Sequence, residues 1–139
     1  MTYAAIRATI ETKVNDAFQA LSPPVSVVFD NVQETPPPLP YVICLVSYTS
    51  TTEARLCMDG TGIEDLRGNL QLSIYSPLGE GMGPLELLAT EGMRVMNTMY
   101  NPTAAARVKC GPISGPTPVL GGDQPYALVT LSCAFTATA

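Results

Sequence analysis

The sequence predicts an α+β fold in which two amphipathic helices pack on one face of a mostly antiparallel sheet. Apolar residues recur at helical spacing near the N-terminus and again after residue 83. They alternate with polar residues over residues 69–75 and 126–138, as expected for strands with one covered face. Most connections between the strands are short, which favours antiparallel neighbours. The predicted order is α-β-β-β-β-α-β-β, in a single domain over residues 1–139.

The composition is that of a globular chain with few charges. Of the 139 residues, 46% are hydrophobic and only 14% are charged, so disorder is excluded. A surface with few charges suits a protein that buries part of its exterior in an assembly. An ordinary small domain with a Ser- and Thr-rich exterior has the same composition, so composition leaves both alternatives open.

The first predicted element is a helix over residues 3–21. Thr2 can cap its start, and the sequence SPP at residues 22–24 ends it, because a residue before proline is pushed out of the helical region. Arg7 and Glu11 lie one turn apart on the opposite, solvent-facing side, where an ion pair adds little. The apolar stripe consists of Tyr3, Ile6, Ile10, Val14, Ala17, Phe18 and Leu21.

A short strand over residues 25–29 and a proline-rich segment follow. The segment 30–40 reads DNVQETPPPLP, and its prolines favour an extended chain with few hydrogen bonds. It is either a stiff connector or a proline-rich ligand for a binding domain, and the connector is favoured.

The middle of the chain predicts three more strands. Residues 41–48 are apolar on both faces, which predicts an interior strand, and residues 49–58 predict its partner. Residues 59–68 predict a polar turn before the strand 68–75. The acidic residues of this turn are Asp59, Glu64 and Asp65. They lack the ligand spacing of a calcium loop, so a solvated turn is favoured.

A glycine-rich elbow then leads into the second helix. Gly79, Gly81 and Gly83 precede Pro84, which suits a first helical position. The elbow lacks the Lys-Ser/Thr of a phosphate loop and the spacing of a dinucleotide fingerprint. We therefore interpret it as a connection, and expect Gly83→Val to disturb folding through the backbone without a separable nucleotide-binding defect. The helix is predicted from the stripe Leu85, Leu88, Ala89, Gly92, Met96 and Met99.

The C-terminal part predicts two strands separated by a loop. Residues 106–110 predict a short half-exposed strand, and residues 111–125, rich in Gly and Pro, predict a flexible loop. Residues 126–138 predict the clearest strand of the chain. Its two predicted faces are Ala127, Val129, Leu131, Cys133 and Phe135 on one side, and Thr130, Ser132, Ala134 and Thr136 on the other.

Several classes of function are disfavoured by what the sequence lacks. It has no histidine, so the usual general base and the usual partner of a nucleophile are missing, and we expect no enzyme. The four cysteines form no C-x-x-C pair, so no zinc site is expected, and no other metal or cofactor is implied. Cys44, Cys110 and Cys133 fall in apolar strand patterns, where buried thiols act as small hydrophobes.

Charge and hydropathy restrict the partners. The net charge is −5 with only seven basic residues, which disfavours binding to nucleic acid through phosphate contacts. No apolar run approaches eighteen residues and no secretion signal is present in the sequence, so we expect no membrane contact and a location in a cytoplasm.

The succession of these segments resembles the tail terminator (tail completion) proteins of long-tailed bacteriophages. The resemblance is carried by the N-terminal helix leading into VVFDN at residues 27–31, by the proline-rich run into LPYV at residues 39–42, and by SIYSPLGEGMGPLELLATEGMRVM at residues 73–96. It covers nearly the whole chain, through the order of its elements more than through invariant residues.

The resemblance implies a virion protein of the tail and neck, assembled in the host cytoplasm. It implies a homo-oligomer, a hexameric ring, that caps the tube of tail tube protein, stops its polymerisation and faces the head–tail connector protein. DNA would pass through the lumen without specific binding.

A ring needs contact surfaces, and the sequence offers candidates. The Ser/Thr face of the last strand and the outer face of residues 41–48 can pack on neighbours, and the loops 33–40, 53–67 and 114–124 can order on docking. Apolar groups in an otherwise polar loop point to contacts; an alternative is that they fold back onto their own sheet. The interface candidates are Arg55, Leu56, Met58 and Ile63.

Two other functions remain as alternatives. One is another head–tail neck adaptor of similar size. The other is a small intracellular ligand-binding domain, which predicts a monomer or dimer with a concave pocket.

Overall fold

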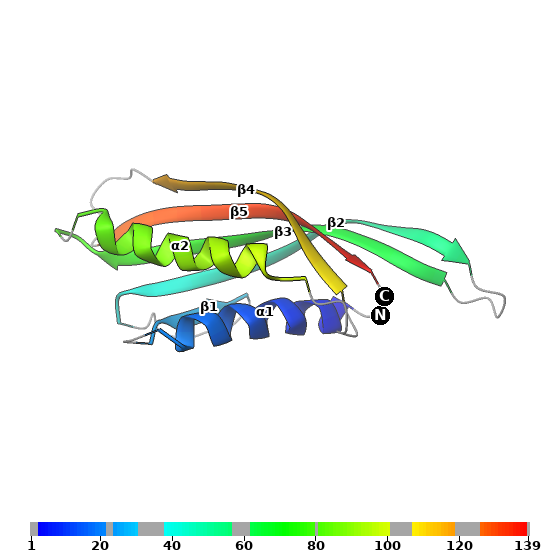
Figure 1. Ribbon diagram of the computed structural model, residues 1–139, viewed down its shortest axis with the longest axis horizontal. Coiled ribbons are helices and arrows are strands. Elements are labelled where there is room, and N and C mark those ends of the chain that lie inside the picture. The colour runs from blue at the N-terminus through cyan, green and yellow to red at the C-terminus, as the bar shows by residue number, and fades with distance from the viewer. Residues whose placement is uncertain are drawn as a thin grey trace.

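The computed structural model confirms the α+β class, with two helices and one five-stranded sheet (Figure 1). It describes residues 3–21, 24–30, 38–56, 62–79, 81–100, 107–118 and 126–138; of residues 50–56, 62–65 and 138 it describes only the backbone. The elements are α1 (Tyr3–Gln19), β1 (Ser26–Phe29), β2 (Tyr41–Leu56), β3 (Gly62–Pro77), α2 (Gly83–Asn97), β4 (Arg107–Pro118) and β5 (Tyr126–Thr138).

The sheet is mostly antiparallel, as predicted. Its strand order is β1-β2-β3-β5-β4. The pairs β2/β3, β3/β5 and β4/β5 are antiparallel, whereas the short edge strand β1 runs parallel to β2. Both helices lie on the same face of the sheet (Figure 1), and the other face carries none of the described elements.

The core lies between the helices and this one face of the sheet. From α1 the buried residues are Ile6, Ile10, Val14 and Phe18, which confirms the predicted stripe except for Tyr3, which is 49% exposed. Gly92 lets α2 approach the sheet closely, because a Cβ there would lie 2.8 Å from the Leu131 side chain. From the sheet the largest fully buried side chains are Leu66, Leu70, Leu72, Ile74, Leu131 and Phe135.

Strand β2 corrects the prediction of two strands over residues 41–58. It is continuous from Tyr41 to Leu56, so the order before α2 has one strand fewer than predicted. Its pairing with β3 shifts register between Tyr48 and Ser50 and again between Glu53 and Arg55. These bulges bend the strand without ending it. β2 is an interior strand, as predicted, and β3 is the central one.

The predicted polar turn over residues 59–68 is shorter than expected. β3 begins at Gly62, so Glu64 and Asp65 lie in a strand, opposite Glu53 and Thr52; Asp59 lies outside the described residues. β3 extends the predicted strand in both directions because its partner β2 is equally long.

Strand β4 corrects the loop predicted for residues 111–125. It runs to Pro118, with register shifts against β5 between Cys110 and Ile113 and between Ser114 and Thr117. An edge strand tolerates proline because its outer side needs no N–H donor. Gly115 has a φ of 106°, and a Cβ there would lie 2.4 Å from the Thr130 carbonyl oxygen. Gly and Pro therefore mark bulges here.

In the elbow before α2, the backbone conformation that favours glycine occurs at Gly79 and Gly81 and not at Gly83, where it was expected. Gly79 and Gly81 have φ values of 88° and 75°, which other residues rarely adopt. Gly83 is the first residue of α2, and an added Cβ would meet nothing within 4 Å. The physical reason given for a folding defect in Gly83→Val is therefore wrong.

Arg7 makes further contacts besides the predicted surface ion pair with Glu11. Its guanidinium lies 3.1 Å from the Asp30 carboxylate and donates to the Val46 carbonyl at 3.1 Å. The same carboxylate accepts a hydrogen bond from the Val46 N–H at 3.3 Å. The guanidinium also lies over the Tyr48 ring, 5.8 Å from its centroid. Arg7 and Asp30 thus cover the edge of β2 just beyond the end of β1.

Burial confirms the core interpretation of two cysteines. Cys44 and Cys133 are buried, and Cys110 is half-buried; Cys57 lies outside the described residues. Burial, and then the nearby carboxylates of Glu11 and Asp30, raises the pKa of the Cys44 thiol from 9.0 to about 12. Cys44 is therefore a neutral thiol at physiological pH.

We expect the free energy of unfolding to fall above pH 9. Since the folded state keeps Cys44 protonated, its stabilising effect is complete below the unfolded pKa of 9.0 and is lost as pH rises toward about 12. The loss approaches about 1.4 kcal/mol per pH unit for one such thiol. Urea unfolding of the parent and of Cys44→Ala between pH 8 and 11 measures it. The variant should show a shallower dependence on pH, and parallel curves would contradict the prediction.

Candidate assembly surface

The described elements leave one face of the sheet uncovered, the face opposite the helices, here called the open face. Along β2, β3 and β5 every second residue points into the core, so the residues between them point to the open face. Arg67 is the only charged residue among them. They are Tyr41, Ile43, Leu45 and Ser47 of β2, Arg67, Asn69, Gln71, Ser73 and Tyr75 of β3, and Tyr126, Leu128, Thr130, Ser132, Ala134 and Thr136 of β5.

Three tyrosines gather at one end of the open face. Tyr41 and Tyr75 are opposite one another in the register, and their rings stack with centroids 4.7 Å apart at 15°. Tyr126 meets Tyr75 edge-on, 4.8 Å away at 72°. Burial raises the pKa of the Tyr41 and Tyr75 hydroxyls above their usual 10.0, so both stay neutral. Such rings offer apolar area with a polar tip, the combination favoured at protein interfaces.

Hydroxyl and amide groups occupy the middle of the open face. Ser73 lies opposite Thr130, and Gln71 lies opposite Ser132. The Gln71 amide donates to the Ser73 hydroxyl at 3.3 Å. Leu45, which is 39% exposed, adjoins Gln71 and leaves apolar area uncovered. This confirms that Thr130, Ser132, Ala134 and Thr136 face away from the core. No described helix covers the second side of β2.

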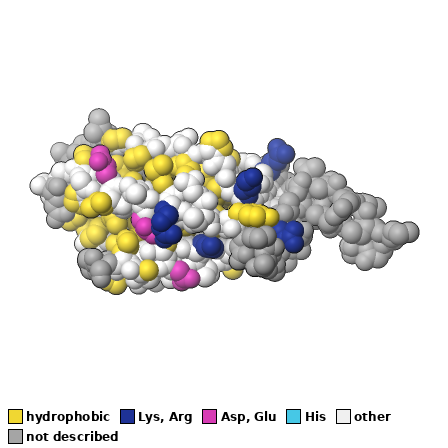
Figure 2. Space-filling view, viewed as in Figure 1, with side chains coloured by type: hydrophobic (Ala, Val, Ile, Leu, Met, Phe, Trp, Pro, Cys, Tyr) yellow, Lys and Arg dark blue, Asp and Glu magenta, His cyan; other side chains and the backbone are white. Residues whose placement is uncertain are grey.

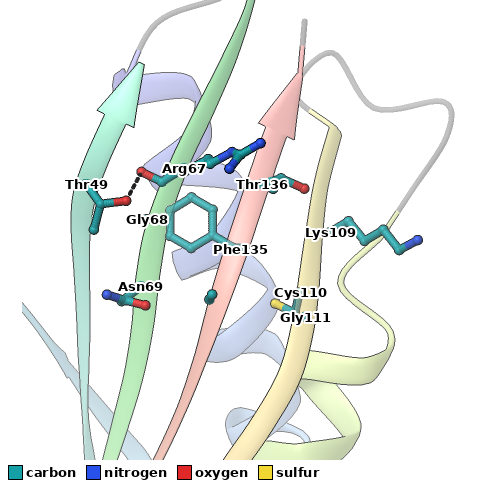
Figure 3. A pocket seen from close by; sticks show the side chains of 10 residues that line it. Thr49, Arg67, Gly68, Asn69, Lys109, Cys110, Gly111, Phe135 and Thr136 are labelled. Atoms are coloured by element: carbon teal, nitrogen blue, oxygen red, sulfur yellow. Dashed lines mark hydrogen bonds between the residues drawn. The ribbon is translucent and has the colours of Figure 1, made fainter. Parts of the chain in front are cut away.

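The other end of the open face holds a shallow hollow of about 470 Å³. Figure 3 shows its side chains, with Arg67 and Asn69 from β3, Thr136 from β5 and Lys109 from β4. The Thr49 hydroxyl donates to the Arg67 carbonyl at 3.1 Å. Two cations at the rim of a shallow hollow suit a carboxylate or another anionic group of a partner.

The chemistry of the hollow does not include an activated nucleophile among the described residues. The Cys110 thiol borders it, but a hydrogen bond with Cys133, and then burial, raises the pKa of Cys110. A thiol of this kind stays protonated and unreactive. Among the described residues, no group of three or more His, Cys, Asp or Glu side chains is placed to hold a metal ion.

The interface candidates lie on a long hairpin formed by β2 and β3. Arg55 is opposite Ile63, and Leu56 is opposite Gly62; Met58 lies outside the described residues. The structure thus brings three of the four candidates together, but corrects their setting, because they lie in strands and not in a polar loop. Residues 53–56, 62–67 and 114–118 of the predicted docking loops are likewise strand.

This hairpin extends past the rest of the sheet. The last pair between β3 and β5 is Asp65 with Thr138, so within the described part of the chain the residues beyond it pair only with each other. In Figure 1 the two strands continue outward from the end of β5. Their backbone therefore does not fold back over its own sheet, which was the alternative for these residues.

Sequence reasoning missed two parts of the surface. The tyrosine cluster comes from three strands, and strand parity would have found it, since Tyr75 follows the core residue Ile74. Leu87 lies off the helical stripe and is 75% exposed. A leucine outside the apolar stripe of a helix is a signal that the sequence already contained.

Comparisons with known proteins show the fold and give no function. No protein-family model matches the chain, and no curated protein is similar to it. Fourteen chains of solved structures match. One of them shares 27% sequence identity with a TM-score of 0.71, over 99% of this chain and 96% of its own. In the described residues, no helix is long and apolar enough to cross a membrane.

Proposed function

We propose that this chain is a structural protein of a long-tailed bacteriophage that caps the tail tube, stops its polymerisation and joins the tail to the head-side connector. The observation that carries the proposal is the open face. Along β2, β3 and β5 it holds one charged residue, Arg67, with Lys109 of β4 beside it, and its other side chains are apolar, aromatic, hydroxyl or amide groups that are exposed or half-buried, except for the buried Tyr41 and Ser73. The helix-to-strand and strand–elbow–helix successions on which the resemblance to tail terminator proteins rests are present in the fold, with β2 as one strand where two were expected.

The physical requirement is a subunit with several distinct contact surfaces. A closed ring uses head-to-tail contacts between unlike surfaces, and the ring must then meet the tube on one side and the connector on the other. The open face, with its cationic hollow at one end, and the projecting hairpin give this chain unlike surfaces. We propose a hexameric ring in the neck of the virion, with DNA passing through its lumen without specific binding.

Assembly with purified tail tube protein from the same phage tests the function. We expect tubes of fixed length, each ending in a ring, by negative-stain imaging, and rings of the chain alone at high concentration by light scattering. Tubes that grow unchecked, with the chain bound only to connector, would indicate the neck adaptor. A monomer that ignores both partners would reject the proposal.

A charge in the open face is expected to abolish capping. Ser132→Glu places a carboxylate in the middle of a face that must lose its water on contact, where an unpaired charge costs several kcal/mol. The half-exposed position keeps the monomer folded, which circular dichroism checks. Thr12→Glu, on the exposed side of α1, is the matched control and should cap normally. Unchanged capping by Ser132→Glu would remove the open face from the proposal.

A further inference from the structure

Two cysteines lie side by side on the adjacent strands β4 and β5. Cys110 is opposite Phe135 and Cys133 is opposite Ile113, so the two thiols are diagonal neighbours across the ladder. Both lie on the core side of the sheet, where Cys133 is buried and Cys110 packs against the same core. Figure 3 shows the Cys110 sulfur on the side of β4 that faces β5. The two free thiols are hydrogen-bonded to one another.

Among the cysteines whose side chains the structure describes, this pair alone can be reached from the surface. Cys110 is half-buried and lines two hollows, the one of about 470 Å³ on the open face and another of about 380 Å³ beside the end of α2. Cys44 has no exposed area and lies in the interior strand β2. A small reagent therefore has a route to the pair past Cys110, whereas Cys44 is closed to it.

The backbone at the pair has room to adjust. Between Cys110 and Ile113, β4 has one residue more than the facing part of β5, which makes a bulge. β4 is an edge strand, paired on one side only among the described strands. Diagonal Cα atoms in a regular ladder are about 7–8 Å apart, and a disulfide needs about 4.4–6.8 Å. A short movement of the bulged edge strand toward β5 covers this difference.

Positive charge borders the hollow through which the pair is reached. Lys109 and Arg67 are both opposite Thr136, so they lie in one row across three strands, and none of the described residues that line the hollow is acidic. On the face shown in Figure 2, Lys and Arg side chains lie toward the end where β4 begins, and the visible Asp and Glu side chains lie farther along the molecule. These cations favour the approach of an anionic reagent.

We propose that Cys110 and Cys133 form a disulfide that joins the edge strand β4 to β5 after the chain has left a reducing cytoplasm. The oxidant is an anionic small-molecule disulfide of the kind represented by oxidised glutathione. The timing rests on the proposed function, because a virion is assembled in the host cytoplasm, where thiols stay reduced, and is then released into oxidising surroundings. Formation of the bond in the purified chain does not depend on that function.

The bond forms by two thiol–disulfide exchanges that conserve atoms and electrons. The hydrogen bond from Cys110 lowers the pKa of Cys133, so Cys133 supplies the first thiolate when local opening of the bulged edge admits the reagent. Its sulfur attacks one sulfur of the small disulfide, whose S–S bond breaks, and the first small thiolate leaves and takes up a proton. Cys110 then gives up its proton and attacks the Cys133 sulfur, which expels the second small thiolate. The two cysteines lose two electrons and two protons, and the small disulfide becomes two thiols.

Mass spectrometry of the purified full chain tests the bond. In a Cys57→Ser background, oxidised glutathione should remove two hydrogen atoms from the chain without leaving glutathione attached. After cleavage at Tyr126, the fragments that contain Cys110 and Cys133 should stay joined until a reductant is added. The urea midpoint should rise by about 1–2 M, because the bond closes a loop over residues 110–133 in the unfolded chain.

Two variants control this measurement. Cys110→Ala, at a half-buried position, should form no internal bond, and its urea midpoint should be the same with and without oxidised glutathione. Cys44→Ala removes a thiol that lies away from the pair, so it should form the bond and gain stability on oxidation as the parent does.

The outcomes separate this inference from the proposed function. A parent chain that keeps its thiols, or that only takes up glutathione, would overturn the inference, and so would a bond to Cys44 or a bond formed by Cys110→Ala. Released phage particles should contain the disulfide, and particles in which Cys110 and Cys133 remain thiols would overturn the timing. A chain that forms the bond but never caps tail tubes would reject the proposed function and support the disulfide.

Discussion

Replacing Gly68 with alanine is expected to lower the free energy of unfolding by about 2–4 kcal/mol. A Cβ at this position would lie 2.2 Å from the Ser47 carbonyl oxygen, and 2.7 and 2.9 Å from two carbons of the Phe135 ring. The first neighbour is backbone in the adjacent strand, and the second is a buried side chain, so neither can move away without disturbing the sheet.

Urea unfolding followed by circular dichroism measures this loss, and Gly83→Ala is the matched control. Nothing lies within 4 Å of a Cβ at Gly83, and the residue begins α2. Alanine there should be neutral or stabilise by up to about 1 kcal/mol, because it restricts the unfolded chain. Equal losses of stability at the two glycines would show that the close contacts at Gly68 are not the reason why this position requires glycine.

The elements that the sequence predicted well are those whose pattern is local. The stripe of Ile6, Ile10, Val14 and Phe18 has the helical period, and all four residues are buried. The alternation over residues 126–138 likewise matches β5 (Tyr126–Thr138) residue by residue. In each case one face of the element packs against the core, so the spacing of apolar residues in the sequence equals the spacing of buried residues in the structure.

The elements predicted poorly depend on contacts between distant residues. The parallel pairing of β1 with β2 joins Ser26 to Tyr41 across the proline-rich segment, and no local pattern encodes that direction. β2 was predicted as two strands divided after Tyr48, which is where its register against β3 shifts. In β4 the turn-forming Gly115 and its neighbouring prolines lie in edge-strand bulges, since pairing with β5 outweighs local preference.

The candidate surfaces also differ in how far the sequence alone could predict them. The polar side of β5 follows from alternation alone, so Thr130 and Ser132 could be placed on it from the sequence. The tyrosine cluster needs the register of three strands, which no local pattern gives. That Arg55, Leu56 and Ile63 form a contact stays a prediction, and their position in a projecting hairpin follows only from the lengths of β2, β3 and β5.

Replacing Phe135 with alanine is expected to cost about 3–5 kcal/mol, the largest loss from one side chain considered for this chain. Phe135 is 1% exposed and lies over Gly68, and its ring meets the Tyr48 ring edge-on with centroids 6.2 Å apart. The alanine would leave a cavity beside Gly68 of β3 and Tyr48 of β2. The same unfolding measurement applies, with Phe135→Leu as the control that keeps most of the volume and should lose less.

The double variant Gly68→Ala with Phe135→Ala tests why the two residues occur together. Removing the ring takes away two of the three close contacts that a Cβ at position 68 would make, but the Ser47 oxygen at 2.2 Å remains. The double variant should therefore be more stable than the sum of the two losses predicts, by about 1 kcal/mol or more, yet less stable than Phe135→Ala alone. Strict additivity would show that the Ser47 backbone alone requires glycine here, and that the ring only fills the space above it.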